Sequence, residues 1–225
     1  MKKQNLFLIL LVTLWVVSFT SCQPNEPKPT FENGYEYVDL GLSVRWASCN
    51  VGAGESYEIG DFFAWGEVNA KSDYSWATYQ HGSGKNELQK YTLSEDGSPV
   101  VLGAEDDAAS VLMGGEWRMP TREEFVELKT KCTWAYAQMK ETLGYYITGP
   151  SGKSIFMPAG GFKDETHHVD YNSAGYYWTS TLDNENAACS ISLDFVAGNS
   201  SVGSSSRFYG QSIRGVLPYS ESSAE

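Results

Sequence analysis

The segment GGEWRMPTREEF, residues 114–125, carries the clearest local structure signals in the chain. Its two leading glycines allow a backbone turn that residues with a side chain rarely adopt. Thr121 precedes Glu124 by three residues, which is the capping-box pattern of a helix start. An apolar stripe continues from this start at Phe125, Leu128 and Cys132. The segment therefore predicts a turn and then a helix that lays one face on a core.

Arg118 stands in the same segment between a tryptophan and a methionine that we expect in the core. A guanidinium in that place needs a carboxylate such as Asp106 or Asp107, or several carbonyl groups, because an unpaired buried charge is costly. Arg45 and Arg214 each lie inside an apolar run, and the same reasoning applies to them. We expect all three arginines to be structural buried charges.

A second helix is predicted just upstream, over AEDDAASVLMG, residues 104–114. Its acids would fall in the first turn, where they suit the helix dipole, and glycines end it. Its apolar face would be formed by Ala104, Ala108, Val111 and Leu112.

Short alternating or apolar runs lie on both sides of the two helices and predict strands. They are residues 35–42, 44–51, 61–67, 145–148, 154–159, 176–181, 189–195, 201–206 and 211–217. Strands, then two helices, then more strands indicate an α+β domain with an antiparallel sheet.

The N-terminus has the pattern of an export signal. Lys2 and Lys3 precede a short apolar run, and Cys22 closes that run after two small residues, which resembles the lipobox of bacterial lipoproteins. Acylation of Cys22 would attach the protein to a membrane. The predicted organisation is a signal peptide over 1–22, a flexible proline-rich tether over 23–34, a folded domain over 35–218 and a disordered tail over 219–225.

The chain is strongly acidic, with 16 basic and 28 acidic residues and a net charge of −12. Nucleic acid is excluded as an expected partner, because phosphate binding relies on lysine and arginine. The expected partners are the membrane, through the lipid, and a glycan or a surface protein.

With Cys22 acylated, three cysteines remain at positions 49, 132 and 189. An oxidising compartment permits one disulfide among them and leaves one free thiol. The residues alone leave all three pairings open.

The histidine pair His167 and His168, with Asp164, Glu165 and Asp170 nearby, could offer ligands to zinc or another divalent ion. Adjacent histidines point apart on a strand, so we expect no metal site. Motifs for a serine nucleophile, a zinc protease or a phosphate loop are absent, so we expect no catalytic residues, no cofactor and no enzyme.

Read in order, several strings resemble the Fibrobacter succinogenes major paralogous domain family of secreted and lipid-anchored bacterial proteins. These strings are YVDLGLSVRWASCNVGA, GDFFAWGE, EDDAA, GGEWRMPTREEF, KCTW, SIFMPAGGFKD, GYYWTST and FYGQSIRG, within residues 35–217. The resemblance implies a C-type-lectin-like fold with two helices, twisted antiparallel sheets and long loops. It also implies a location in the bacterial cell envelope and a disulfide between Cys49 and Cys132.

The same fold group includes formylglycine-generating enzymes and calcium-dependent sugar-binding lectins. The enzymes use two nearby cysteines late in the chain, whereas Cys189 stands alone in its region. The calcium-binding strings of the lectins are absent as well. An enzyme of formylglycine-generating-like fold is therefore the least favoured function.

Aromatic residues flanked by small polar ones make a binding surface the favoured function, because such surfaces suit sugars and protein epitopes alike. The candidate binding residues are Trp76, Tyr79, Tyr171 and Tyr209. We expect a lipid-anchored protein of the outer membrane that acts in binding or adhesion. The cell surface is one of the two faces of that membrane on which it could lie. The alternative is a structural envelope or fimbria-associated subunit without a small ligand.

Overall fold

The computed structural model of the protein describes residues 29–219. Within them the chain forms two short helices and several antiparallel sheets, and most of its regular secondary structure is strand, in agreement with the predicted mixed class. The helices are α1 (Ala108–Met113) and α2 (Arg122–Lys131). The strands are β1 (Thr30–Glu32), β2 (Tyr35–Val38), β3 (Val44–Ala47), β4 (Thr133–Met139), β5 (Thr142–Thr148), β6 (Ser154–Pro158), β7 (Phe162–Asp164), β8 (His167–Val169), β9 (Ala174–Leu182), β10 (Cys189–Val196), β11 (Asn199–Ser206) and β12 (Val216–Pro218).

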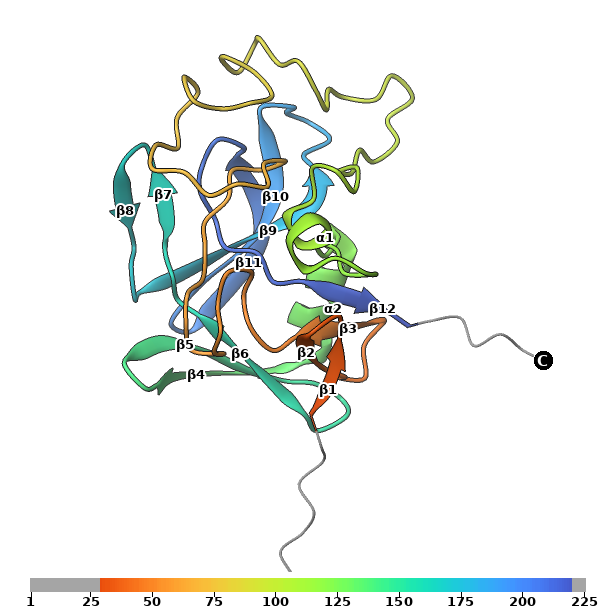
Figure 1. The fold of residues 1–225 in the computed structure, drawn as a ribbon, viewed down its shortest axis with the longest axis vertical. Coiled ribbons are helices and arrows are strands. Elements are labelled where there is room, and N and C mark those ends of the chain that lie inside the picture. Colours follow the sequence, from red (N-terminus) through yellow and green to blue (C-terminus); the bar gives the residue numbers. More distant parts are fainter. Residues whose placement is uncertain (1–28, 220–225) are drawn as a thin grey trace, which may run out of the picture.

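The strands form four sheets in which neighbours run antiparallel (Figure 1). One sheet has the order β1-β2-β3-β12, so both described ends of the chain belong to it. The other sheets have the orders β11-β10-β9, β4-β5-β6 and β7-β8. The later part of the loop-rich segment between β3 and α1 lies at the top of Figure 1, at the opposite end of the domain from β1.

Helix α2 begins as predicted at a capping box. The Thr121 hydroxyl accepts from the Glu124 N–H at 3.3 Å, and a Glu124 carboxylate oxygen accepts from the Thr121 N–H at 2.8 Å. Phe125 and Leu128 are completely buried and Cys132 is partly buried, so the predicted stripe faces the core. The helix packs on β9, β10 and β11.

Helix α1 is shorter than predicted, and of the four residues predicted for its apolar face only Ala108 is buried. It begins only at Ala108 because Asp107 is its N-cap and accepts from the Ser110 N–H at 2.9 Å, which places the acids before the helix. Val111 and Leu112 are exposed, whereas Ala108, Ala109 and Met113 are buried.

The predicted strand over 61–67 does not form, and the one over 211–217 forms only at its end, in β12. Residues 61–67 and 211–215 meet through an isolated pairing of Phe63 with Gln211. Gly60 and Gly66 have φ values of 75° and 80°, so the chain turns at both ends of the first of these segments.

The sequence analysis missed β4, β7 and β8, and it placed a fourth strand, β1, in the tether. β7 and β8 have three residues each, which is too short for an alternating pattern. β1 falls within the predicted tether and pairs with β2 over three residues. Residues 1–28 and 220–225, with the signal peptide, the lipidation site Cys22 and most of the tail, lie outside the described residues. Between residues 29 and 219, no helix is both long and apolar enough to span a membrane.

Four tryptophans anchor the interior. Each has at most 1% of its surface exposed: Trp46, Trp65, Trp117 and Trp178. Trp46 packs on Phe125 of α2, with ring centroids 5.4 Å apart. The other three belong to a second cluster that joins α1 to the loop-rich segment. The loops are therefore packed onto the sheets by large buried side chains.

Candidate ligand-binding site

Tyr79, one of the four predicted binding residues, is only 5% exposed. Its hydroxyl donates to the Trp65 carbonyl at 2.7 Å and accepts from Arg207 Nε at 2.7 Å. Burial raises the pKa of Tyr79, so it stays a neutral phenol. Tyr79 therefore holds loops together and has no surface for a ligand, contrary to the prediction.

Trp76 and Tyr209 are partly buried in a chain of aromatic contacts. The Trp76 ring lies 5.1 Å from that of Phe208, and the Tyr209 ring lies 5.0 Å from that of Phe162. These rings pack loops together, and Tyr171 is not among their contacts.

Tyr171 is different, because 59% of its surface is exposed. The residues on either side of it, Asp170 and Asn172, both have φ of 55°, the left-handed region that non-glycine residues rarely adopt. Asn172 Oδ1 accepts from the Leu143 N–H of β5 at 2.6 Å. The Asp170 carbonyl accepts from the N–H groups of Ser173 and Ala174, each at 3.1 Å. A strained but well-bonded turn thus presents an aromatic ring to solvent.

Beside this turn lies an open hollow of about 480 Å³. It is lined by Tyr57, Glu58, Lys140, Glu141, Thr142 and Tyr171. Lys140 and Glu141 form the two-residue turn between β4 and β5, and Lys140 has φ of 55°. A Glu58 carboxylate oxygen accepts from the N–H groups of Gly54 and Glu55, at 2.8 and 3.2 Å. We call this hollow the Tyr57–Tyr171 hollow.

The Tyr57–Tyr171 hollow offers two phenol rings, two carboxylates, an ammonium group and a hydroxyl. Aromatic faces can stack on the C–H face of a sugar, and the polar groups can hydrogen-bond its hydroxyls. The sequence prediction included Tyr171 but missed the other five residues. Lys140, Glu141 and Thr142 lie at the β4–β5 turn, which was not recognised because β4 was not predicted, and the other two lie in the loop after β3.

Of the three arginines predicted to be buried, Arg214 is completely buried, whereas Arg45 and Arg118 are only partly buried. The partner of Arg118 is a carboxylate, as expected, but it is neither Asp106 nor Asp107. Arg118 pairs with Glu124, at 2.8 and 2.5 Å to its two carboxylate oxygens, which raises the pKa of Arg118. Asp107 instead caps α1 and accepts from the Met119 N–H at 2.8 Å. Asp106 instead accepts from the Tyr91 hydroxyl at 2.6 Å.

Arg214 is completely buried and has no carboxylate partner among residues 29–219. It donates to the carbonyls of Ala47, Ser48 and Phe156, at 2.9, 2.9 and 2.8 Å, and to Asn50 Oδ1 at 2.9 Å. Arg45 is half-buried, and its guanidinium lies 4.7 Å from the Tyr37 ring centroid.

Among the described residues, Arg207 is a second completely buried arginine, and the sequence reasoning missed it. Besides Tyr79 it donates to the carbonyls of Lys90, Tyr91 and Ala187, at 3.1, 3.0 and 3.0 Å. Its position after a serine run gave no sign of burial.

The histidine pair lies on β8, where the two side chains alternate across the strand. His168 Nε2 is bonded to the Gly160 carbonyl at 2.7 Å, and its ring packs on Tyr171. Among the described residues no group of three or more histidine, cysteine or acidic side chains is placed to hold a metal ion.

Cys49, Cys132 and Cys189 are all free thiols, so the structure does not form the expected disulfide between Cys49 and Cys132. The reason is placement: Cys132 ends α2 and packs on the core under that helix, whereas Cys49 follows β3 and lines a surface groove. Burial and the nearby Glu127 carboxylate raise the pKa of Cys132 to about 11.

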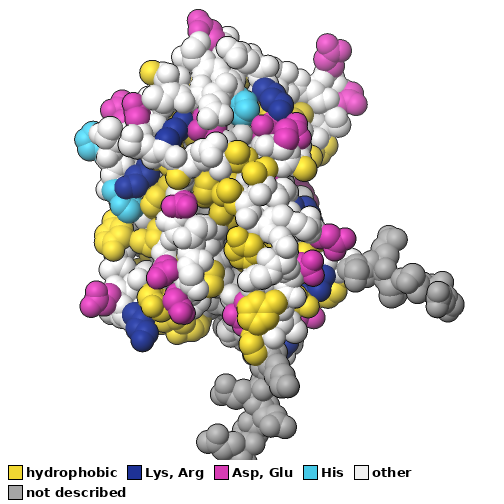
Figure 2. Space-filling model, viewed as in Figure 1, with side chains coloured by type: hydrophobic (Ala, Val, Ile, Leu, Met, Phe, Trp, Pro, Cys, Tyr) yellow, Lys and Arg dark blue, Asp and Glu magenta, His cyan; other side chains and the backbone are white. Residues whose placement is uncertain are grey.

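Both signs of charge are interspersed on the face shown in Figure 2, and no basic stripe gathers there. Comparison of the chain with protein-family models, with curated proteins and with solved structures finds no match.

Proposed function

We propose that the protein is a lipid-anchored cell-envelope protein whose folded domain binds carbohydrate, without catalysis, in the Tyr57–Tyr171 hollow. The anchor and the outer-membrane location are proposed on the N-terminal pattern, with its apolar run ending at Cys22. β1, the first described strand, lies at the opposite end of the domain from the loops at the top of Figure 1, so these loops would then face away from the membrane.

One observation carries the binding proposal: Tyr171 is exposed, yet the backbone on both sides of it is hydrogen-bonded and its ring packs on His168, with centroids 5.0 Å apart. Ordering a side chain costs free energy on binding, and a ring whose backbone and one edge are already held loses less. Backbone strain of the kind at Asp170 and Asn172 concentrates where a side chain must be presented in one direction.

We also propose that the domain has a C-type-lectin-like fold and belongs to the Fibrobacter succinogenes major paralogous domain family. The support is the role of the resembling strings in the structure. Trp117 and Met119 of GGEWRMPTREEF are buried, and Arg214 of FYGQSIRG joins β3 to β6 through carbonyl groups.

A glycan array probed with the full chain in detergent micelles tests the binding proposal. For a glycan that binds, we expect Tyr171→Ala to weaken affinity by about tenfold or more, the loss typical of a central aromatic contact. Phe31→Ala is the matched control, because Phe31 is 58% exposed and lies on β1, and it should leave affinity unchanged.

Three outcomes contradict the proposal in different ways. Binding that Tyr171→Ala leaves intact moves the site elsewhere, and an empty array favours the structural subunit instead. Turnover of a bound glycan makes the protein an enzyme. The anchor is tested separately: Cys22→Ala should move the protein from the membrane fraction to the soluble fraction.

A further inference from the structure

β4 is an outer strand of its sheet, and among the described strands it pairs only with β5. The bond from the Ala159 N–H to the Leu143 carbonyl shows that the odd-numbered residues of β5 turn their backbone groups toward β6. The even-numbered residues of β5 therefore bond to β4, at its odd-numbered residues. As a result, the N–H and C=O groups of Trp134, Tyr136 and Gln138 point away from the sheet. We call these groups the β4 edge.

The β4 edge is accessible to solvent. None of the seven residues of β4 is buried, and Thr133, Ala135 and Gln138 are exposed. Within residues 29–219, no hydrogen bond reaches an N–H or C=O group of the β4 edge. Figure 1 shows β4 at the lower left of the molecule, on the rim of the domain.

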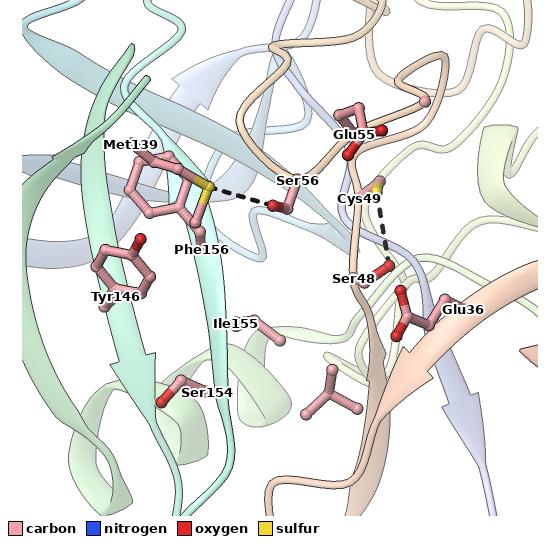
Figure 3. Close-up of a pocket in the computed structure, with 12 residues that line it drawn as sticks. Glu36, Ser48, Cys49, Glu55, Ser56, Met139, Tyr146, Ser154, Ile155 and Phe156 are labelled. Atoms are coloured by element: carbon pink, nitrogen blue, oxygen red, sulfur yellow. Dashed lines mark hydrogen bonds between the residues drawn. The ribbon is translucent and has the colours of Figure 1, made fainter. Parts of the chain in front are cut away.

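The nearest loop covers a face of this sheet and not the β4 edge. Met139 of β4, Tyr146 of β5 and Phe156 of β6 line one side of a hollow of about 270 Å³, and residues of the loop after β3 line the other (Figure 3). There the Ser56 hydroxyl donates to Met139 Sδ at 3.3 Å. Side chains stand above and below a sheet, whereas the backbone groups of an edge lie in its plane, so this contact leaves the β4 edge open.

β4 also lacks the features that keep sheet edges from pairing. Its sequence, TWAYAQM, contains no charged residue, proline or glycine. Three other outer strands are protected: β1 and β12 have only three residues each, and residues 155–158 of β6 are buried. A long uncharged strand with an open edge is a template for another strand.

A second copy of β4 fits this edge in one register. In an antiparallel pair centred on Tyr136, Trp134 lies opposite Gln138 of the second copy, and each such pair exchanges two backbone hydrogen bonds. This register alone bonds all groups of the β4 edge to one another. It brings the two Tyr136 side chains together at the two-fold axis and places Ala135 opposite Ala137 of the second copy.

The charges at the ends of β4 favour the same register. With Tyr136 at the axis, the β4–β5 turn of one copy lies beside the end of α2 in the other, so Glu141 approaches Lys131. Glu141 is exposed and forms no ion pair in the described part of the chain, and the Lys131 side chain is 61% exposed. Lys140 of the same turn lies opposite Cys132, which ends α2, where the helix dipole favours a cation. Both contacts occur twice by symmetry.

We propose that two copies of the chain pair antiparallel along β4, about a two-fold axis at Tyr136. Three strands from each copy then form one continuous sheet. Each copy uses the same surface, so the assembly closes at two copies. The net charge of −12 opposes association, but lysines outnumber glutamates at this interface. The charged residues there are Lys129, Lys131, Lys140, Glu127 and Glu141.

Introduced cysteines test the register with the full chain in detergent micelles. Ala135 and Ala137 of the second copy would form a non-hydrogen-bonded pair with Cα atoms about 4.5 Å apart, within reach of a disulfide. A mixture of Ala135→Cys and Ala137→Cys chains, treated with oxidised glutathione, should therefore crosslink severalfold more than either variant alone. In either variant alone the two introduced thiols are two residues out of register, about 8 Å apart and beyond that reach. Peptide mapping must place the crosslink between positions 135 and 137, because the native thiols can also react.

Sedimentation equilibrium in density-matched micelles measures the association itself. Glu141→Lys places a lysine beside Lys131 of the second copy and should weaken dimerisation by about fivefold. Glu95→Lys makes the same change in net charge at an exposed loop residue and should have no effect. Gln138→Pro removes an outward N–H without touching the bonds to β5 and should weaken dimerisation by about tenfold or more, whereas Gln138→Ala keeps that N–H and should retain the dimer.

Two outcomes overturn the proposal. The first is a chain that sediments as a monomer at about 0.1 mM and crosslinks no more in the mixture than in the single variants. The second is a dimer that Gln138→Pro leaves intact, because its interface then lies elsewhere. No glycan is present in these experiments, and Tyr171→Ala should dimerise like the parent chain, so the result is independent of the carbohydrate proposal.

Discussion

Arg207 donates from Nε to the Tyr79 hydroxyl at 2.7 Å, although the two residues are 128 positions apart in the chain. The Arg207 guanidinium also lies 4.8 Å from the Trp65 ring centroid and bonds three loop carbonyls. The end of β11 is thereby fastened to the loops that cover the sheets.

Replacing Arg207 with alanine should be strongly destabilising. The change leaves the carbonyls of Lys90, Tyr91 and Ala187 without donors in a buried site, and such losses cost about 3–5 kcal/mol in total. Urea unfolding measures the loss. Arg122→Ala is the control, because the Arg122 side chain is half exposed, and it should stay within about 0.5 kcal/mol of the parent. Equal stability of the two variants would show that Arg207 does not hold the loops.

Tyr79→Phe separates packing from ligand binding. Loss of the hydroxyl removes the bonds to Trp65 and Arg207, and we expect a cost of about 1–2 kcal/mol in urea unfolding. Carbohydrate affinity should not change, because the ring has no exposed face. A loss of affinity with unchanged stability would return Tyr79 to the binding site.

Local signals predicted the parts of the fold that local chemistry determines. The capping box at Thr121 and Glu124 marked the start of α2, and regular alternation marked β9 and β10. Helix α1 shows the limit of this reasoning. Asp107 caps the helix and also accepts a hydrogen bond from the N–H of Met119, twelve residues away. The helix therefore begins later than its apolar pattern suggested.

The candidate site could be predicted only in part, because burial of an aromatic side chain depends on distant partners. Tyr79 and Tyr171 both have polar neighbours in the sequence. In the structure Tyr79 is buried and accepts a hydrogen bond from Arg207, whereas Tyr171 is exposed beside a turn that Asn172 holds to Leu143. The partner of Arg118 was missed for a related reason: Glu124 serves both the capping box and the ion pair. No spacing rule separates such cases.

Asn172→Ala should lower carbohydrate affinity although we place Asn172 outside the hollow. Its side chain accepts from Leu143 N–H at 2.6 Å, and without that bond a left-handed residue beside Tyr171 loses its support. We expect a severalfold weaker Kd with about 1 kcal/mol lower stability. Titration calorimetry measures the affinity. Asn172→Gly should weaken binding as well, because glycine adopts the left-handed conformation easily but cannot bond to the Leu143 N–H. Unchanged affinity in both variants would show that the turn need not be fixed.

Thiol chemistry tests the absence of a disulfide. Alkylation of the unfolded chain without a reducing agent should label Cys49, Cys132 and Cys189, and peptide mapping should find no crosslinked pair. In the folded chain Cys132 should react slowly, because its pKa of about 11 leaves little thiolate at neutral pH. A crosslinked peptide containing Cys49 and Cys132 would contradict the structure and favour the pairing that the family resemblance implies.

Stability should fall at alkaline pH through buried tyrosines. Tyr177 is completely buried, donates to the Pro158 carbonyl at 2.7 Å, and has its pKa raised to about 12 by burial. An unfolded tyrosine loses its proton near pH 10, so the contribution of Tyr177 is complete below pH 10 and is lost as the pH rises through about 12. Tyrosinate absorbance and circular dichroism followed together should change at the same pH. Tyr177→Phe should make stability less dependent on pH between about 10 and 12, because it removes the titrating group. Ionisation of all tyrosines near pH 10 with the fold intact would show that Tyr177 is not sealed in the core.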